Sequence, residues 1–342
     1  MLRVGVVGAG WVAVNRHIPS LIRDDRVHVV GLACPSLQTA EVVSKKFGIE
    51  KFYTSIDELL KQELDIVDIC TPPFTHHEIV IKAAEAGCHI FVEKPFAMSS
   101  KEAEEMITAA RHHNVKLCVC HNFLYSNSMK RVKTLHDSGQ LGQLTGAIAF
   151  QMSNLKRRLP TWYSSLPGGL FFDESPHMIY SIIELFGDVS VKWARTISAS
   201  GKQPVNCVEA TMVSNSIDAS SYLRFTSNAP RDEWILTVLG TKRAVVVDFF
   251  RDSIIEIGEG GTHTPSEVLG NSLNFIWQAA KETLKSGFRF LSRKLYFGHD
   301  ELIRLFINSV VSDTEPPQPG EKGKKVIELI EQILEKGYAL ER

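Results

Sequence analysis

The 342-residue sequence predicts an α/β protein that begins with a doubly wound parallel sheet. The first observation is an apolar run, Leu2 to Val7, which suits a central parallel strand buried on both faces. The second is the turn that follows it, Gly8-Ala9-Gly10, and the third is an alternation of strand-like and helix-like segments. Because parallel strands are joined by right-handed crossovers, this alternation predicts helices on both faces of one sheet.

The later elements of this first region follow from hydrophobic periodicity. The expected strands are Val27–Ala33, Ile66–Cys70, His89–Val92 and Val115–Cys120. The expected helices are Leu37–Phe47, Thr75–Ala86 and Ser99–His112. An earlier helix, after the glycine turn, is expected to restart at Pro19 after an irregular turn.

The glycine turn has the G-x-G-x-x-A spacing of a dinucleotide-binding loop. Gly8 permits a tight turn, Gly10 lets the backbone approach a pyrophosphate, and the small Ala13 lets helix and strand pack closely. The helix that follows would direct its N-terminus at the phosphates. We therefore expect Gly8, Gly10, Trp11 and Val12 to contact NAD or NADP.

Two further stretches should meet the glycine loop, because ligands of such sheets bind at the carboxyl ends of the strands. One follows the strand at Ile66 and contributes Thr71, Pro72, Pro73 and His76. The other is Glu93-Lys94-Pro95, where the proline fixes the backbone and gives the lysine side chain a defined direction.

The ribose end of the cofactor site is unusual. An acid after the second strand normally binds the ribose 2′-hydroxyl of NAD, and an arginine there suits NADP. This sequence has neither in Ala33-Cys34-Pro35-Ser36, although Ser36 can bond a 2′-phosphate. Cys34 and Ser36 are thus expected at the cofactor, and the choice between NAD and NADP stays open.

Bulk composition excludes several classes of protein. A net charge of −1 gives no electrostatic case for nucleic acid, and no apolar run is long enough to span a membrane. The N-terminus is interpreted as a strand and not a signal peptide, so the six cysteines predict reduced thiols in the cytoplasm. Cys118, Cys120 and His121 have no second cluster of matching spacing, so no metal site is predicted.

The motifs "GAGWVA", "TPPFTHH", "EKP" and "GG…DESPH" occur in this order, and with them the sequence resembles the Gfo/Idh/MocA oxidoreductases over nearly its whole length. The resemblance implies a Rossmann domain at 1–120 and an α/β domain at 121–342 that binds substrate on a large, mostly antiparallel sheet. It also implies final helices that pack back toward the N-terminal domain, and a homodimer or homotetramer formed through that sheet.

The second region supports this interpretation with alternating stretches that suit strands. These are "LTGAIAFQM", "EATMVSN", "SSYLRFT", "WILTVLG" and "RAVVVDF". The stretch "LGTKRAVV" predicts a hairpin with Gly240 in its turn.

The resemblance makes Lys94, Asp173 and His177 the catalytic residues. Their chemistry fits the oxidation of a secondary alcohol, in which a histidine accepts the hydroxyl proton while hydride moves to the nicotinamide. Lys94 can stabilise developing negative charge on the oxygen, and Asp173 can orient the imidazole. The spacing of Asp173 and His177 predicts one helix face, one turn apart.

The sequence departs from the family pattern where substrate contacts are expected. Ser175 replaces a common glycine, and Tyr180 replaces an acid three residues after the histidine. Asn122 of the family's "GFNxR" pattern is kept and assigned to the cofactor, but Leu124 stands where an arginine is common. Tyr125 and Tyr180 are expected at a more apolar substrate site than in many relatives.

Two basic stretches have open interpretations. The segment 272–298 carries Phe275, Trp277, Phe288, Phe290, Phe297, Lys281, Lys285, Arg289, Arg293 and Lys294. We expect it to pack on its own domain or a neighbouring subunit, with an anionic group or a membrane surface as the alternative. Lys156, Arg157 and Arg158 are expected in a solvated loop. If either patch is functional, a nucleotide sugar becomes the favoured substrate.

Together these features predict an NAD(P)-dependent oxidoreductase that acts on a hydroxyl or ketone of a sugar or sugar derivative. Two alternatives stay open. One is an NAD-dependent glycosidase that oxidises its substrate transiently, and the other is a cofactor-binding sensor without turnover. The sequence does not name the sugar, the carbon, the direction of reaction or the oligomer size.

Overall fold

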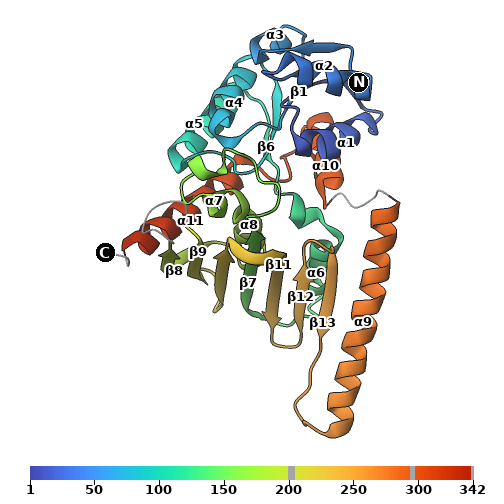
Figure 1. The fold of residues 1–342 in the computed structure, drawn as a ribbon, viewed down its shortest axis with the longest axis vertical. Helices are drawn as coiled ribbons and strands as arrows, with labels where there is room; N and C mark the ends of the chain where they lie inside the picture. Colours follow the sequence, from blue (N-terminus) through green and yellow to red (C-terminus); the bar gives the residue numbers. More distant parts are fainter. Residues whose placement is uncertain (199–204, 293–296, 340–342) are drawn as a thin grey trace. The chain divides into compact units, whose positions relative to one another are not determined.

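The structure is a computed structural model that describes residues 1–198, 205–292 and 297–339. The chain divides into two compact units, each built on its own sheet (Figure 1). The first unit is Met1–Asn122 with His299–Glu331, and the second is Phe123–Gly298 with Gln332–Arg342. The boundary near residue 122 recurs at 298 because a late segment of the chain returns to the first unit.

The first unit contains a six-stranded sheet in the order β3-β2-β1-β4-β5-β6, with every neighbouring pair parallel. Its strands are β1 (Leu2–Val7), β2 (Val27–Ala33), β3 (Lys51–Tyr53), β4 (Ile66–Ile69), β5 (His89–Val92) and β6 (Leu117–Val119). This is the doubly wound Rossmann order, and it confirms the predicted fold class. The order reverses between β1 and β4, so the loops after these two strands adjoin at the place where such sheets bind ligands.

The helices of the first unit begin and end close to their predicted positions. They are α1 (Ile18–Ile22), α2 (Leu37–Phe47), α3 (Ile56–Leu60), α4 (His76–Glu85) and α5 (Ser100–His112). The Ser36 and Ser99 side chains cap α2 and α5 by accepting backbone N–H bonds from Thr39 and Glu102. A π-helical turn, Ala13–His17, precedes α1, so the helix is irregular before Pro19, as expected.

The end of the chain completes the first core. The helix α10 (His299–Val311) packs Phe306 on Phe91 of β5, with ring centroids 5.4 Å apart. At the start of α11 (Gly320–Ala339), a Cβ on Gly323 would lie 2.9 Å from the Phe96 ring, so only glycine allows this approach. Residues more than 200 positions apart in the sequence therefore share one core.

The second unit contains a seven-stranded sheet in the order β13-β12-β11-β7-β10-β9-β8. Its strands are β7 (Leu144–Asn154), β8 (Val189–Ile197), β9 (Cys207–Ser214), β10 (Ser220–Thr226), β11 (Asn228–Gly240), β12 (Ala244–Asp248) and β13 (Ser253–Ile257). Only the β7–β10 pair is parallel among these neighbours, so the mostly antiparallel sheet is confirmed. The β11–β12 hairpin turns after Gly240, as predicted.

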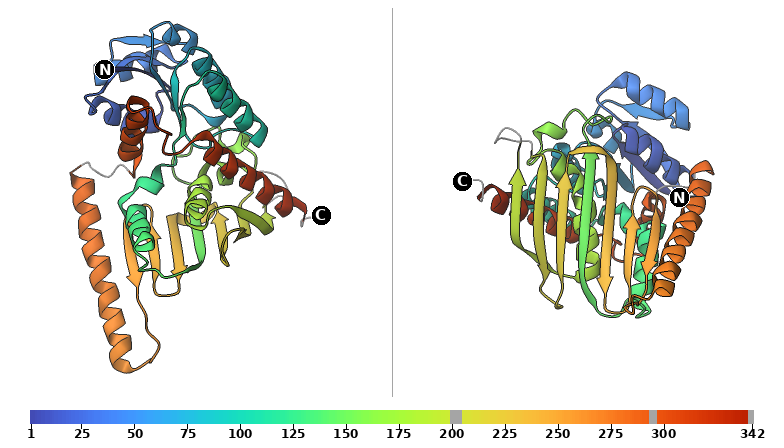
Figure 2. Two further views of the ribbon diagram at one scale, coloured as in Figure 1. Left: turned by 180° about the vertical axis from the view of Figure 1, so that it is seen from behind. Right: turned by 60° about the horizontal axis from the view of Figure 1, so that its bottom comes forward.

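Three helices cover one face of this sheet, and two of them, α7 (Leu170–Glu174) and α8 (Pro176–Phe186), hold the predicted catalytic residues Asp173 and His177. The third is α6 (Asn127–Asp137), and α6 and α8 lie against the same face (Figure 2). The burial of β7 alternates accordingly, with Ala149, Gln151 and Ser153 buried. The helix α9 (Pro265–Leu291) runs beside β13 at the edge of the sheet.

Candidate functional site

The glycine loop has the geometry that a bound pyrophosphate requires. Gly8 has a φ of +104°, and a Cβ there would lie 2.6 Å from the backbone oxygen of Cys70, so the turn admits only glycine. A Cβ at Gly10 would meet nothing within 4 Å, which leaves the backbone open to a ligand. Trp11 is 58% exposed, and the Arg16 guanidinium lies 5.0 Å from the centre of its ring. Val12 follows at the start of the helix.

The loop after β4 is held by its own side chains. The Thr75 hydroxyl donates to Thr71 Oγ1 at 2.7 Å, and Pro73 opens a single 3-10 turn, Pro73–Thr75. His76 is fully buried, with its ring nitrogens 2.9 Å from the Thr71 carbonyl oxygen and 3.2 Å from that of Phe96. Burial lowers the pKa of His76. His76 therefore ties this loop to the chain after β5, and its contact with the cofactor stays a prediction.

Lys94 follows β5 directly and is joined to Pro95 by a cis peptide. The backbone N–H of Lys94 donates to Oε2 of Glu93 at 3.0 Å. Glu93 is only 5% exposed, so its carboxylate faces the interior of the first unit. The sequence assigned Glu93 to the cofactor, whereas the structure places it under the Lys94 peptide.

The sequence analysis missed His17, which lies between two buried carboxylates. Its Nδ1 is 2.9 Å from Asp68 Oδ1, and its Nε2 is 2.8 Å from Glu93 Oε1. His299 approaches the same Glu93 oxygen at 3.6 Å. No sequence motif marks His17. It is buried because it ends the π-helical turn Ala13–His17, which is seen only in the structure.

Two residues of this cluster, His17 and Glu93, have shifted pKa values. Burial by itself would lower the pKa of His17, but the neighbouring Asp68 carboxylate outweighs burial and raises that pKa well above its ordinary value. Burial would raise the pKa of Glu93, but hydrogen bonds from His17 and His299 lower it well below its ordinary range. The two groups are therefore a buried ion pair beneath Lys94.

The same cluster contains the donor atoms that could hold a metal ion. Those of His17, Glu93, Cys120 and His299 lie within 4.8 Å of one another, as do those of His17, Asp68 and Cys70. The His17 ring already bonds both carboxylates at hydrogen-bond distance. These donors therefore satisfy one another as they stand.

The residues after β2 bring no carboxylate to the ribose position. Ser36 caps α2 and accepts from the backbone N–H of Thr39 at 3.3 Å, and Cys34 is half-buried with its N–H bonded to Tyr53. Ser36 is thus committed to its helix.

Asp173 and His177 do not share one helix, in contrast to the prediction. Asp173 lies on α7, which ends at Glu174, and His177 lies on α8, which begins at Pro176. Proline has no backbone N–H, so it cannot continue the hydrogen-bond ladder of α7 and instead starts a new helix. The two residues remain one turn apart in sequence, but on consecutive helical segments.

His177 is surrounded by aromatic groups. Its Nδ1 lies 2.8 Å from the Tyr180 hydroxyl, which also accepts from the backbone N–H of Phe123 at 3.1 Å. The rings of Phe123 and Trp234 lie 4.8 and 5.1 Å from the imidazole. Tyr180 is only 2% exposed. It is therefore the hydrogen-bond partner of His177, and its contact with substrate stays a prediction.

Trp234 is a second residue that the sequence analysis did not identify. Its side chain is buried, and its indole Nε1 has no hydrogen-bond partner among the described residues. A buried donor without a partner costs stability, which makes this group a candidate to bind a ligand.

A buried acid fixes the helix that carries Asp173. Glu174 is 2% exposed and bonds the Ser153 hydroxyl and the Arg157 guanidinium. Arg157 also lies 3.1 Å from Asp232. Of the predicted solvated loop, Lys156 and Arg158 are exposed, but Arg157 anchors α7.

The remaining predicted residues flank the boundary between the units. Asn122 is buried and Tyr125 half-buried in one 3-10 turn, Asn122–Tyr125. The first unit holds Lys94 and the glycine loop, and the second holds Asp173, His177 and Tyr180.

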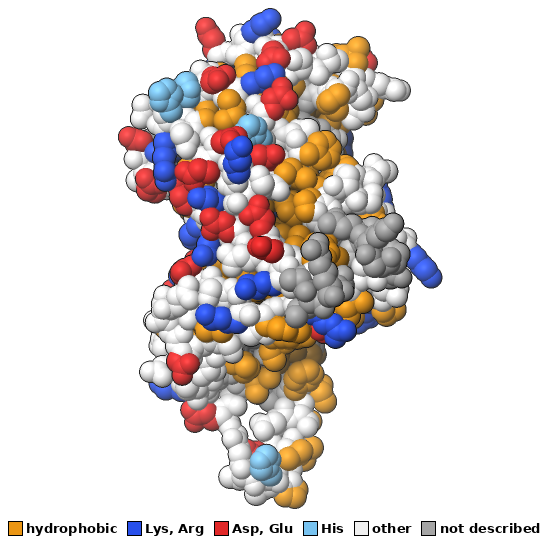
Figure 3. Space-filling view, turned by 90° about the vertical axis from the view of Figure 1, so that its left-hand side faces the viewer, with side chains coloured by type: hydrophobic (Ala, Val, Ile, Leu, Met, Phe, Trp, Pro, Cys, Tyr) orange, Lys and Arg blue, Asp and Glu red, His pale blue; other side chains and the backbone are white. Residues whose placement is uncertain are grey.

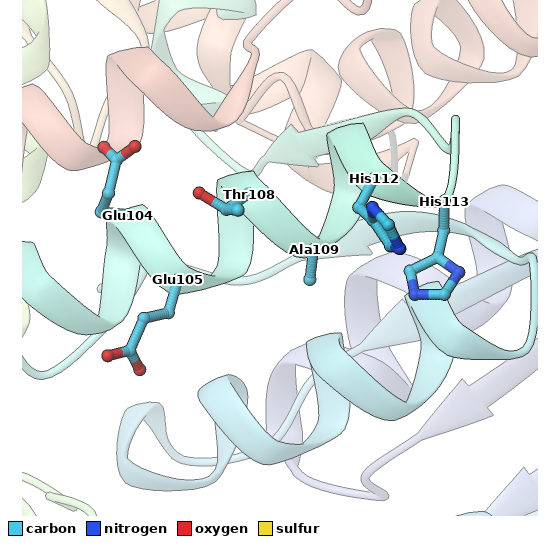
Figure 4. Close-up of a pocket in the computed structure, with 6 residues that line it drawn as sticks. All are labelled: Glu104, Glu105, Thr108, Ala109, His112 and His113. Carbon is cyan, nitrogen blue, oxygen red and sulfur yellow. The ribbon is translucent and has the colours of Figure 1, made fainter.

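A shallow pocket on α5 lies apart from these predicted residues. It is lined by Glu104, Glu105, Thr108, Ala109, His112 and His113 (Figure 4). His112 and His113 are exposed, as the sequence predicted for the end of a surface helix. Charged side chains of both signs are interspersed on the face in Figure 3, which matches the near-neutral composition.

The fold and glycine loop define a dinucleotide-binding enzyme of the Rossmann type. Residues 2–121 match the family described as an oxidoreductase family with an NAD-binding Rossmann fold. This match over the Rossmann region confirms the resemblance to the Gfo/Idh/MocA oxidoreductases that the motifs predicted.

Known proteins resemble this chain beyond the matched domain. A myo-inositol 2-dehydrogenase of Thermotoga maritima is 26% identical over all of this chain and 96% of its own length. A D-glucoside 3-dehydrogenase of Escherichia coli is 28% identical over 56% of each chain. The WlbA dehydrogenase of Bordetella pertussis, solved with NADH and UDP-GlcNAcA, has a TM-score of 0.81 and 21% identity over 99% of this chain and 96% of its own.

Proposed function

We propose that this enzyme transfers a hydride between a nicotinamide cofactor and a secondary hydroxyl or ketone of a sugar or sugar derivative. The named relatives support this substrate class, because they are dehydrogenases of inositol and a glucoside. They give no support to the sensor or glycosidase alternatives. The observation that carries the proposal is the hydrogen bond of 2.8 Å between His177 and Tyr180.

The Tyr180 hydroxyl can hydrogen-bond Nδ1 of His177 whether or not that nitrogen carries a proton. A phenol O–H can donate to Nδ1 when the ring has its proton on Nε2, and its oxygen can accept from Nδ1–H when Nε2 is free. In the state with Nδ1–H bonded to the phenol oxygen, Nε2 carries no proton and can take the alcohol proton in oxidation. The ring is then an imidazolium that keeps its Nδ1–H bond, and it returns the Nε2 proton in reduction. An ionised carboxylate at position 180 would only accept, and would hold the proton on Nδ1.

The other residues have proposed roles around this proton transfer. Lys94 stabilises the negative charge that develops on the reacting oxygen, and Asp173 orients the ring or holds a neighbouring hydroxyl. The Trp234 N–H donates to the substrate. When bound, NAD or NADP supplies the hydride acceptor, and Gly8, Gly10 and the Thr71–Pro73 loop hold its pyrophosphate and nicotinamide ends.

A nucleotide sugar is the favoured substrate within this class. The structurally similar WlbA dehydrogenase was solved with UDP-GlcNAcA, a nucleotide sugar acid. The apolar surroundings of His177 suit a substrate that gains its affinity from groups remote from the reacting carbon. The six cysteines, all free thiols, support a reducing compartment such as the cytoplasm.

A cofactor titration followed by a substrate screen tests the proposal. Exposed Trp11 should report NADH or NADPH binding by its fluorescence, which also decides between the two cofactors. UDP-sugars and the corresponding free sugars are then compared by absorbance at the nicotinamide band. Reduction of the cofactor by a UDP-sugar but not by the free sugar supports the proposal, and cofactor binding without turnover on either set contradicts it.

A further inference from the structure

The helix α9 is joined to its own sheet by its polar side. The Gln278 amide exchanges two hydrogen bonds of 2.9 Å with the backbone N–H and carbonyl of Glu256 on β13. Arg289 donates to the carbonyl oxygen of Asp252 at 2.7 Å. The only buried residue among the 27 of this helix is Ser286. These contacts fix the orientation of α9 and turn its opposite side outward.

The outward side is apolar, so of the two expected packing partners, its own domain and a neighbouring subunit, the first does not cover these aromatic residues. Ten large side chains of α9 are between 51 and 81% exposed: Val268, Leu269, Leu273, Phe275, Ile276, Trp277, Leu284, Phe288, Phe290 and Leu291. An ordinary surface helix has the reverse arrangement, with its apolar stripe on the core. The amphipathicity of α9 is therefore inverted.

Five of these apolar residues form one continuous stripe along the helix. Leu269, Leu273, Trp277, Leu284 and Leu291 recur at spacings that keep one helix face in line over the whole of α9. The helix is roughly 40 Å long at 1.5 Å per residue. It lies along β13 and extends past the end of that strand (Figure 1).

The exposed area is that of an interface. Ile276 and Phe288 lie beside these five residues, and at roughly 100 Å² for each half-exposed large side chain the seven together present roughly 700 Å² of apolar surface. The largest apolar patch of a typical monomer is about 300–600 Å², and a standard interface buries about 800 Å² per partner. One α9 thus supplies most of the share of one partner.

We propose that the stripe on α9 binds the same stripe of a second copy of the chain, as an antiparallel helix pair about a twofold axis. Ala280 and Gly287 lie within the stripe between larger residues, and a Cβ at Gly287 would meet nothing within 4 Å, so a partner's side chains have room there. An antiparallel pair also opposes the two helix dipoles favourably. A twofold contact needs only one self-complementary surface.

A lipid surface is the competing occupant, and the charges of α9 disfavour it. Three basic residues, Lys281, Lys285 and Arg289, stand against Glu267 and Glu282. Lys285 is paired with Glu282, and Arg289 is bonded to Asp252, so little positive charge remains for anionic headgroups. Among the described residues, no helix is both long and apolar enough to cross a membrane.

The solution mass of matched variants tests the proposal. The wild type, Leu273→Asp/Leu284→Asp and the control Asn274→Asp are compared by sedimentation from 1 to 100 µM. Asn274 is exposed and lies outside the stripe, about 100° around the helix from Leu273. The double variant should have half the mass of the wild type and of the control, with unchanged circular dichroism and cofactor binding. Equal masses for all three proteins, or a monomeric wild type, would overturn the proposal.

A cross-link tests the antiparallel arrangement even if the double variant misfolds. Near the midpoint of α9, each residue meets its own copy, so Ala280→Cys should form an interchain disulfide on mild oxidation, whereas Asn274→Cys should not. Flotation with vesicles of phosphatidylcholine and phosphatidylglycerol completes the test. Binding of the wild type that the double variant loses would assign the stripe to lipid and contradict the proposed helix pair.

Discussion

His17 in the first unit and His177 in the second are both buried histidines, at 0 and 5% exposure, but their neighbours differ in kind. His17 lies between two carboxylates, which only accept hydrogen bonds and so hold a proton on each ring nitrogen. His177 lies among aromatic rings and bonds a phenol hydroxyl, which can donate or accept. The two carboxylates keep His17 protonated. The phenol hydroxyl leaves His177 able to gain and lose a proton. Burial alone therefore does not indicate which histidine is catalytic.

The substitution His177→Ala tests the proposed catalytic role of the second histidine through its effect on activity. We expect kcat to fall by about a hundred- to ten-thousandfold, because the proton-transfer group is lost. NADH binding should persist, since the glycine loop belongs to the other unit. His136→Ala, at an exposed position of α6, is the matched control. Steady-state kinetics on the substrate from the screen measure the effect, and a kcat within threefold of the wild type would exclude the proposed role.

The substitution His17→Leu tests the structural role of the first histidine through its effect on stability. Removing one partner of a buried ion pair leaves Asp68 and Glu93 uncompensated, which costs about 3–5 kcal/mol of unfolding free energy. Urea unfolding measures this cost, with His28→Leu on the exposed side of β2 as the control. A loss below 1 kcal/mol would show that the two carboxylates are not charged in the folded protein.

The substitution Tyr180→Phe tests the hydrogen bond between Tyr180 and His177. It removes the hydroxyl that bonds the ring and the Phe123 N–H, so we expect a loss of about 1–3 kcal/mol in unfolding free energy. We also expect kcat to fall about tenfold, with a shifted pH–rate profile, because His177 loses its proton partner. Tyr163→Phe controls for the loss of a hydroxyl. An unchanged pH–rate profile would restrict Tyr180 to packing.

The smallest expected effect is the pH dependence of the ion pair. The raised pKa of His17 gives stability that is full below its unfolded value of ~6.5 and is lost as pH rises through the folded value. The lowered pKa of Glu93 gives stability that is present above ~4.3 and is lost as pH falls through the folded value.

The free-energy difference between wild type and His17→Gln should therefore be largest between about pH 4.5 and 6.5 and decrease on either side. Urea unfolding at pH 5.5, 7.5 and 9 measures it. A difference that grows steadily toward pH 9 would reverse the assigned sign.

Local signals explain why the first unit was predicted well. The helix Leu37–Phe47 has its predicted bounds because Ser36 caps its start and Gly48, with a φ of +70°, ends it. The strands that were overestimated, such as Val115–Cys120 against the observed Leu117–Val119, differ only where pairing with a neighbour stops. Strand ends depend on that neighbour, which the local sequence does not encode.

The site was predicted less completely. Lys94, Asp173 and His177 carry recognisable motifs, but His17 has no motif and gains its partners from β4 and β5. Tyr180 was interpreted as a missing acid, although its role is set by the Phe123 backbone 57 residues away. The side toward which the apolar face of α9 points was left open, because periodicity gives the width of an apolar face and not the side on which the sheet lies.

The sequence alone determined the fold class, the glycine loop, the family and the predicted catalytic residues, because these depend on short spacings along the chain. The tertiary structure decided what surrounds each side chain: the carboxylates at His17, the hydroxyl at His177 and the outward stripe of α9. Those surroundings come from segments far apart in the sequence, and hydrogen bonds and burial act over a few ångströms of space regardless of that separation.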